Sequence, residues 1–390
     1  MNRLAIIISH PIQYYTPLYQ RLARREDLTI KVFFTWHAGK VPVFDDGFKV
    51  PVAWDIPLKQ GYEFELVPNV AKKPGTNHFF GLRNPSLIER VEAWRPNTIH
   101  ITGWSSLSHL QALHYFGKRL PTLFRGDSHL LDNQDSDVRW AVKKIVLKRV
   151  YSWPTAFLVV GAANRAYYEA FGVAHQRLYL CPHSIDVNRF AEPSGGLEDE
   201  AVQWRRELGI SDERRVLLFA GKFEPRKQPL HLMHAVQMLA DRKLLLLMVG
   251  SGELQAEVDA IAASDPDRFR VLPMQNQSRM PIVYRLAELF VLPSAYGETW
   301  GLAVNEAMAC KRPVLVSDRV GCAQDVVDPS CGRIFPSADT ASLAQTIGEM
   351  MRDRNALLQM GAAASVRAQL FDIAQTEVGL VAALAQIRTT

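Results

Sequence analysis

Residues 297–317 read GETWGLAVNEAMACKRPVLVS. One glutamate, Glu298, stands in a glycine-flanked turn, and a second, Glu306, follows seven intervening residues later in an apolar run before the strand-like PVLVS. The pattern predicts a helix beginning near Gly301 and packed on a sheet, whose first backbone N–H groups attract anions. A carboxylate on such a helix is costly unless hydroxyl or N–H donors meet it. The simpler interpretation is that Glu298 caps the helix and Glu306 faces water.

Around this stretch, short apolar runs alternate with helical patterns, which is typical of βαβ units and parallel sheets. The expected strands of the first half are 4–9, 28–34, 63–67, 98–102, 121–124, 156–160 and 178–181. The alternation stops at a Pro/Gly-rich segment and restarts with strands expected at 215–221, 243–250, 269–272, 289–293 and 313–317. The sequence therefore predicts an α/β protein with two Rossmann-like, doubly wound domains facing an interdomain cleft.

The expected boundaries follow from the same pattern. An N-terminal, acceptor-binding domain is predicted over 1–190, a linker over 191–200 and a nucleotide-sugar-binding domain over 201–370. A C-terminal helix over 371–390 is predicted to pack back on the first domain. The segment 42–82 has Pro, Gly and aromatic residues but no clear period, which indicates a long loop region.

Charge is unevenly distributed between the two halves. Residues 1–195 hold 24 Lys and Arg against 16 Asp and Glu, whereas the remainder holds 21 against 24. A basic first half suggests an anionic partner: nucleic acid, a membrane surface or a phosphate-bearing acceptor. Apolar runs such as 244–249 have the length of strands rather than the roughly 20 residues of a membrane span. Four cysteines without CxxC spacing indicate reduced thiols, and we expect a cytoplasmic protein.

A second stretch, 219-FAGKFEPRKQPLHLMHAV-236, supports the first. Lys222 and Lys227 follow a predicted strand, at the sheet edge where Glu298 is also expected. Cations there suit a diphosphate whose negative charge grows as a bond to it breaks. Solvated loop lysines are the alternative interpretation.

Taken in order, these motifs resemble a known family. The sequence G-K-F-x-x-x-K, then VGSGE, then PS-x-x-GE-x-x-GL-x-x-NEAMA-x-x-x-PV-x-VSD-x-x-G resembles the C-terminal domain of retaining GT-B glycosyltransferases of family 4, with Glu298 and Glu306 at its E-x7-E positions. The resemblance runs from about 215 to 350. The segment 182-PHSIDVNRF-190 and the opening SHPIQYY add looser support in the first half.

The resemblance implies roles for individual residues. Lys222 and Lys227 would hold the nucleotide diphosphate, although the family more often has Arg at the first position. Glu306 would bind the ribose hydroxyls and Glu298 the hydroxyls of the donor sugar, with Glu298, Lys227 and Asp127 as the catalytic set. Backbone amides would contact phosphate and sugar at Thr299, Trp300, Gly301 and Leu302, and the base would pass near Pro273 and Met274.

The sequence does not decide which residues of the first half take part in the site. His10 and Gln13 follow the first strand, where hydrogen bonds to donor or acceptor are possible, but a structural histidine fits as well. After the strand at 121–124 comes RGDSH, and the family places a catalytic-site histidine in this region. Asp127 and His129 both fall near that position, and the sequence does not choose between them.

Two further patterns concern partners. D-x-D pairs occur at 135–137 and 265–267, but the fold implied by the resemblance holds diphosphate with cations and helix ends, so we expect no metal and no cofactor. The stretch 139-RWAVKKIVLKRVY-151 predicts a basic amphipathic helix that either rests on an anionic membrane surface or, as is more common, faces the core with a solvated basic side.

The sequence thus predicts a metal-independent glycosyltransferase that moves a sugar from a nucleotide-diphosphate donor to a hydroxyl acceptor, such as a glycan or a lipid-linked saccharide, with retention of configuration. One alternative is a non-hydrolysing nucleotide-sugar epimerase of the same fold. The other is a non-catalytic binder of sugar nucleotides or nucleic acid, although no recognition helix, RNP-like aromatic set or zinc module supports nucleic acid.

Overall fold

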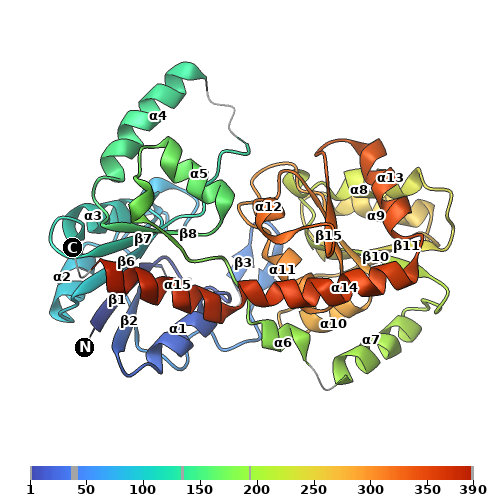
Figure 1. Ribbon diagram of the computed structural model, residues 1–390, viewed down its shortest axis with the longest axis horizontal. Helices are drawn as coiled ribbons and strands as arrows, with labels where there is room; N and C mark the ends of the chain where they lie inside the picture. The colour runs from blue at the N-terminus through green and yellow to red at the C-terminus, as the bar shows by residue number, and fades with distance from the viewer. Residues whose placement is uncertain (1, 37–42, 133–135, 193–194, 388–390) are drawn as a thin grey trace. The chain divides into compact units, whose positions relative to one another are not determined.

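The computed structural model describes residues 2–36, 43–132, 136–192 and 195–387. The chain divides into two compact units (Figure 1). Unit 1 comprises residues 1–40, 57–183 and 373–390, and unit 2 comprises residues 41–56 and 184–372. Each unit is therefore built from more than one stretch of sequence.

Unit 1 is a parallel sheet in the order β5-β2-β1-β6-β7-β8-β9. Its strands are β1 (Asn2–Ile8), β2 (Leu28–Phe34), β5 (Phe64–Leu66), β6 (Thr98–Thr102), β7 (Thr122–Arg125), β8 (Ala156–Val159) and β9 (Leu178–Leu180). Its helices are α1 (Thr16–Ala23), α2 (Leu87–Ala93), α3 (Leu107–Phe116), α4 (Asp137–Val150), α5 (Ala162–Ala170) and α15 (Ile373–Gln386), with 3-10 turns η1 (Phe79–Gly81) and η2 (His175–Arg177). All seven strands expected in this half are present.

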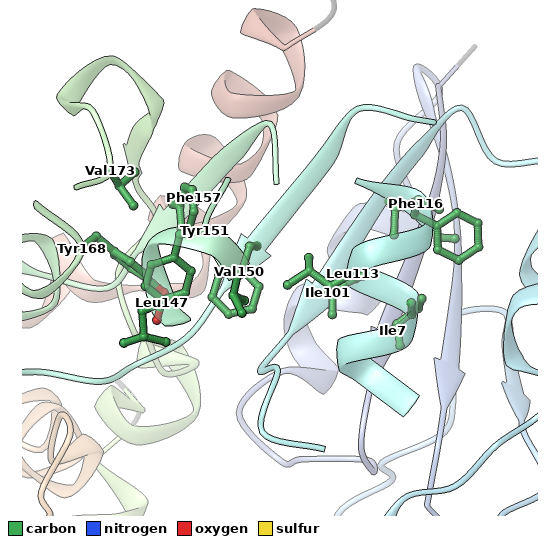
Figure 2. Packing of buried hydrophobic residues seen from close by; sticks show 14 of the residues in the cluster. Ile7, Ile101, Leu113, Phe116, Leu147, Val150, Tyr151, Phe157, Tyr168 and Val173 are labelled. Carbon is green, nitrogen blue, oxygen red and sulfur yellow. The ribbon is translucent and has the colours of Figure 1, made fainter. Parts of the chain in front are cut away.

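The core of unit 1 joins the sheet to its helices on one face. Figure 2 shows Ile7 and Ile101 of the sheet beside Leu113 and Phe116 of α3, and Leu147 of α4 near Tyr168 of α5. A second cluster lies on the other face, where Leu380, Ala383 and Leu384 of α15 are buried with residues of β1, β2 and α1. The last helix is thus part of the core of unit 1.

Unit 2 is a second parallel sheet, in the order β12-β11-β10-β13-β14-β15. Its strands are β10 (Arg215–Lys222), β11 (Leu244–Ser251), β12 (Phe269–Leu272), β13 (Leu289–Leu292), β14 (Val314–Ser317) and β15 (Gly332–Phe335). Its helices are α6 (Val187–Ala191), α7 (Gly196–Glu207), α8 (Pro229–Gln237), α9 (Gln255–Ser264), α10 (Met280–Arg285), α11 (Leu302–Ala309), α12 (Ala323–Val326), α13 (Thr340–Met350) and α14 (Arg354–Ala368), with η3 (Pro225–Lys227) and η4 (Gln369–Phe371). The strand order is the 3-2-1-4-5-6 order of the doubly wound fold, so the predicted fold class is confirmed for both sheets.

The region expected to be a loop contains a hairpin that belongs to unit 2. Strands β3 (Val43–Asp45) and β4 (Val50–Val52) pair antiparallel. The strands were missed because they are three residues long and their pattern is too short to show a period.

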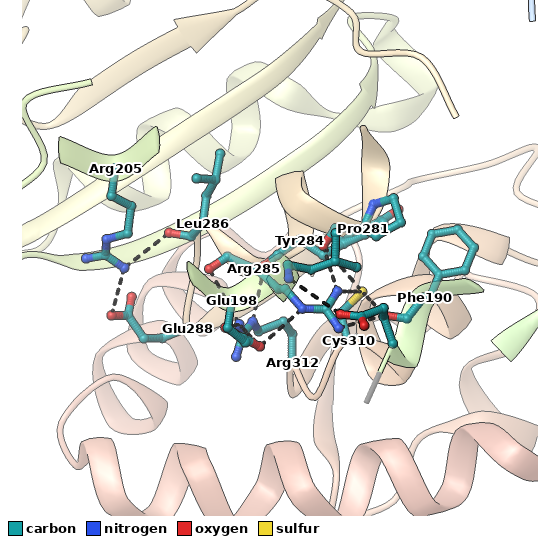
Figure 3. Close-up of polar contacts among 12 residues, drawn as sticks. Phe190, Glu198, Arg205, Pro281, Tyr284, Arg285, Leu286, Glu288, Cys310 and Arg312 are labelled. Carbon is teal, nitrogen blue, oxygen red and sulfur yellow. Dashed lines mark hydrogen bonds and ion pairs between the residues drawn. The ribbon is translucent and has the colours of Figure 1, made fainter. Parts of the chain in front are cut away.

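The described residues of the segment expected to be a linker belong to unit 2, and the stretch of unit 1 that begins at residue 57 ends at 183 rather than 190. α7 begins within the expected linker, at Gly196. Figure 3 shows how buried Arg285 of α10 holds it: the guanidinium donates to the Phe190 carbonyl at 2.7 Å and lies 3.2 Å from the Glu198 carboxylate. Arg312 binds the same carboxylate at 2.9 Å. Because a buried guanidinium needs several acceptors, this network fixes the path of the chain.

Candidate functional site

The strand order reverses between β10 and β13 of unit 2, which pair with each other although a crossover through β11 and β12 separates them in sequence. In open α/β sheets, ligands bind beyond the carboxyl ends of strands at such a point. Lys222 is the last residue of β10, and the turn carrying Glu298 follows β13. The two predicted motifs therefore meet at this edge.

Lys227 and Glu298 form an ion pair, with side chains 16% and 11% exposed. Lys227 lies in η3 after β10, and Ser294 also donates to Glu298 Oε2, at 3.1 Å. An ammonium group has three N–H donors, so Lys227 can hold Glu298 and still donate to a phosphate oxygen. The structure thus brings a cation and a carboxylate together at the edge where the sequence placed them.

The turn after Glu298 is held by the loop that follows β14. The amide of Gly321 donates to the Glu298 carbonyl at 2.9 Å, and Cys322 donates to the Trp300 carbonyl at 3.0 Å. Gly301 occupies the N-cap of α11 with a φ of 96°, and no side chain caps this helix. A side chain at 301 would be strained there, and its Cβ would lie 2.9 Å from Val320. An uncapped helix start at this edge suits an anion.

Glu306 lies in the second turn of α11 and is 2% exposed. Tyr284 of α10 donates a 2.6 Å hydrogen bond to its Oε2. The interpretation that Glu306 faces water is therefore wrong. A buried carboxylate is suited to hydroxyl donors, and its bond to Tyr284 also gives Glu306 a structural role.

The Trp300 indole belongs to the core of unit 2. It is 3% exposed, and its Nε1 donates to Asn305 Oδ1 at 3.0 Å. Any ligand contact at this position would therefore come from the backbone, as the resemblance implies. Thr299 and Leu302, on either side of Trp300 and Gly301, are half-buried.

Lys222 has a partner that the sequence analysis missed. Its Nζ donates to Asp45 Oδ1 at 2.8 Å and lies 5.0 Å from the centre of the Phe48 ring. Asp45 also accepts from the amides of Gly47 and Phe48. Burial tends to raise the pKa of Asp45, but the hydrogen bonds from Lys222 and Phe48 outweigh it and lower that pKa. A diphosphate at Lys222 would have to compete with this carboxylate.

The same segment of unit 2 reaches the loop after β12, where the base was expected. Asn276 donates to the Ala53 carbonyl at 2.5 Å, and the Ser278 amide donates to Asp55 at 3.1 Å. Pro273 is exposed and Met274 half-buried, and the Pro273 carbonyl accepts from Gln275 at 3.0 Å. Residues 43–56 thus contact the loops that end β10 and β12.

In unit 1, the equivalent edge has a different chemistry. Arg125, the last residue of β7, is 2% exposed and donates to Cys181 carbonyl at 2.8 Å and to His183 Nδ1 at 3.3 Å. His183 Nε2 lies 3.9 Å from Asp127 Oδ2, and the Asp127 side chain is 53% exposed. Burial lowers the pKa of His183, although Asp127 opposes the shift. The three residues form a continuous polar chain that ends at an exposed carboxylate.

The four first-half candidates are placed differently. The His129 side chain is 5% exposed and its Nδ1 accepts from the Leu131 amide at 3.2 Å, which favours a role in shaping its own loop. His10 is half-buried, its Nδ1 lies 2.9 Å from Ser9 Oγ, and burial lowers its pKa. Gln13 is half-buried in the turn before α1. Asp127 is the candidate with an exposed charged group.

The RGDS loop is fixed by α5. Asn164 donates to the Gly126 and Ser128 carbonyls at 3.0 and 2.7 Å, and the Tyr168 hydroxyl donates to Gly126 at 3.0 Å. His183 was missed because it lies far from this loop in sequence. The signal available was its position directly after a predicted strand end at 178–181.

No helix in the described part of the chain has both the length and the apolar character that crossing a membrane requires. Within the same residues, no group of three or more His, Cys, Asp or Glu side chains is arranged to hold a metal ion. Asp135 of the first D-x-D pair lies outside the described residues.

Comparison with known sequences gives a family match for the second half. Residues 201–367 match the family described as glycosyl transferases group 1. A D-inositol 3-phosphate glycosyltransferase of Nocardia farcinica is 33% identical over 224 residues, which cover 55% of this chain and 48% of the relative. A protein with the same description from Mycobacteroides abscessus is 34% identical over 152 residues, covering 38% and 34%. The chain spans about half the length, or less, of these curated relatives.

Solved structures match over the whole chain. HepE of Anabaena, determined with UDP and glucose, superposes with a TM-score of 0.71 at 15% identity, covering 99% of this chain and 100% of that one. Sucrose-phosphate synthase of Thermosynechococcus elongatus gives a TM-score of 0.74 at 18% identity, with both chains fully covered. At these identities the likeness establishes the fold.

Proposed function

We propose that this chain, which has the GT-B fold and carries a group 1 glycosyl transferase domain over residues 201–367, transfers a sugar from a nucleoside-diphosphate donor to a hydroxyl group. The observation that carries the proposal is the meeting of Lys227, Glu298 and the uncapped start of α11 where the strand order of unit 2 reverses. UDP in the HepE structure favours a uridine diphosphate donor.

The donor site rests on complementary charge. Lys222, Lys227 and the first N–H groups of α11 would hold the diphosphate, and they would stabilise the charge that grows on it as it leaves. Lys227 and Ser294 both donate to Glu298 Oε2, so Oε1 is the oxygen expected to accept hydroxyls of the donor sugar. Glu306 would accept from the ribose diol beside its bond to Tyr284.

We assign binding of the acceptor to the carboxyl-terminal strand edge of unit 1. Burial keeps His183 neutral at pH 7 because it lowers the pKa of the imidazole. A neutral imidazole next to an exposed carboxylate can accept a hydrogen bond from an alcohol without attracting a competing anion. His183 and Asp127 would therefore orient the acceptor hydroxyl, and the curated relatives, described as D-inositol 3-phosphate glycosyltransferases, make an inositol phosphate the first acceptor to test.

We propose that configuration is retained. The bond between the anomeric carbon and the β-phosphate oxygen breaks, and the acceptor oxygen forms a bond to the same carbon on the same face. The acceptor proton passes to the departing phosphate oxygen, so no enzymic nucleophile is needed. The chain's own groups orient the two substrates and stabilise the diphosphate.

The test is a donor panel followed by product analysis. UDP-, GDP-, ADP- and TDP-sugars are compared by thermal shift and calorimetry, and the stabilising donor is then incubated with inositol phosphates and simple glycosides. A new glycoside with the anomeric configuration of the donor, observed by NMR, supports the proposal. An epimerised nucleotide sugar formed without acceptor identifies the epimerase instead, and failure of every donor to bind contradicts both.

A further inference from the structure

The outer face of α4 carries an apolar ridge. Val138, Val142 and Ile145 have 74%, 57% and 72% of their surfaces exposed. They follow each other at intervals of four and three residues, so they lie on one side of the helix. The row is roughly 10 Å long at 1.5 Å per residue. In Figure 1, α4 lies on the outside of unit 1, and its N-terminal end points away from the sheet.

This ridge is not the face by which α4 is attached to unit 1. Leu147 and Val150 are buried in the core cluster (Figure 2), and Trp140 packs on Phe171 with ring centres 4.9 Å apart. Residues 140, 147 and 150 lie opposite the ridge on a helical period. The interpretation of a core-facing helix with a solvated basic side describes the attachment of α4, and the exposed aliphatic ridge is a feature in addition to it.

Basic side chains flank the ridge. Arg139, Lys144, Lys148 and Arg149 are exposed, and α4 has Asp137 as its one acidic residue. In the described part of the chain, Lys144 and Lys148 form no ion pair. Long basic side chains beside short aliphatic ones match a bilayer interface, where apolar groups enter the acyl boundary and ammonium groups meet lipid phosphates.

We propose that the ridge and its basic flanks form a docking surface for an anionic lipid bilayer. A second copy of the chain fits less well, because a symmetric contact through this face would bring like charges together. The inference depends only on the surface of α4, so it stands or fails independently of the donor chemistry.

The experiment is vesicle flotation of the full chain. We expect binding to vesicles of phosphatidylcholine with about one-third phosphatidylglycerol and little binding to phosphatidylcholine alone, and added salt should weaken it. The double variant K144Q/K148Q should bind about thirty-fold more weakly, since each basic residue near an anionic surface is worth about a factor of five. I145D should weaken binding by at least about tenfold.

The matched control is V366D on α14 of unit 2, because Val366 is 74% exposed, close to the 72% of Ile145. It should bind like the parent chain, and circular dichroism and thermal unfolding should show all variants folded. No binding of the parent chain to anionic vesicles overturns the proposal, as does equal binding by I145D. A lipid-free dimer that I145D dissociates assigns the ridge to self-association and overturns it as well.

Discussion

The carboxyl-terminal strand edges of the two sheets handle charge in opposite ways. In unit 2, Lys222 pairs with Asp45 and Lys227 pairs with Glu298. The cations at this edge are therefore balanced by carboxylates of the protein. In unit 1, buried Arg125 donates to backbone carbonyl oxygens and to the imidazole of His183. Counter-ions can be exchanged for a diphosphate, whereas carbonyls of the backbone cannot leave. The difference supports the proposed anion site in unit 2 and the proposed hydroxyl site in unit 1.

The largest effect is expected for Lys227→Ala, which tests the anion site of unit 2. We expect kcat/KM to fall by about 10²–10³, because a cation aimed at the charge of the leaving group is lost. Calorimetry with UDP should show weaker binding as well. Lys243→Ala is the control, since Lys243 is an exposed lysine paired with Glu213. An unchanged affinity for UDP would place the anion site elsewhere.

His183→Asn tests the edge of unit 1. We expect kcat to fall by about 10–100-fold with unchanged affinity for UDP, because the loss falls on the acceptor and not on the diphosphate. His129→Asn, which keeps an acceptor for the Leu131 amide, should have a much smaller effect. A weakened affinity for UDP in His183→Asn would contradict the separation of diphosphate binding in unit 2 from acceptor binding in unit 1.

The pH dependence of kcat/KM tests the role of His183 further. Burial lowers the pKa of His183, so the imidazole takes up a proton only below its ordinary value near 6.5 and the rate should fall there. Asp127 raises that pKa, and Asp127→Asn should therefore move the acid limb of kcat/KM to lower pH. A limb that stays in place would exclude the imidazole as its origin.

Glu306→Gln separates binding from packing within unit 2. It keeps a side chain of the same size that can accept from Tyr284, and we expect donor affinity to fall by about tenfold through loss of a charged acceptor. Tyr284→Phe removes the other partner and should cost stability more than affinity. Calorimetry and urea unfolding of both variants measure the two effects, and a Glu306→Gln variant with normal affinity would make Glu306 a purely structural residue.

The smallest expected effect is that of Asp45→Asn. Removing the counter-ion of Lys222 should tighten UDP binding by about threefold to fivefold, since a partly exposed ion pair is worth up to about 1 kcal/mol. Asp46→Asn, an exposed neighbour, is the matched control. Weaker binding in Asp45→Asn would show that the carboxylate positions Lys222 rather than competing for it.

Much of the fold could be predicted because buried parallel strands are continuous apolar runs, and the expected strands at 98–102 and 269–272 match β6 and β12 to the residue. Strand β15 was missed because it has four residues and Arg333 interrupts its apolar run. Lys227 and Glu298 could be predicted to meet because both follow strands at one sheet edge. Asp45 could not, since its pairing with Lys222 across such a sequence distance depends on the tertiary fold. His183 could have been found by the same argument as Lys227, because it directly follows the predicted strand at 178–181.

The placement of α15 in unit 1 has a consequence for how the protein is made. Ile373, Leu380 and Leu384 complete the apolar cluster beneath β1 and β2, and Glu377 binds Arg21 and Arg25. During synthesis, residues 184–372 leave the ribosome before this helix, so unit 2 can finish folding while the N-terminal half still exposes an uncovered sheet face. Unit 1 therefore completes its core only after the whole of unit 2 has been synthesised.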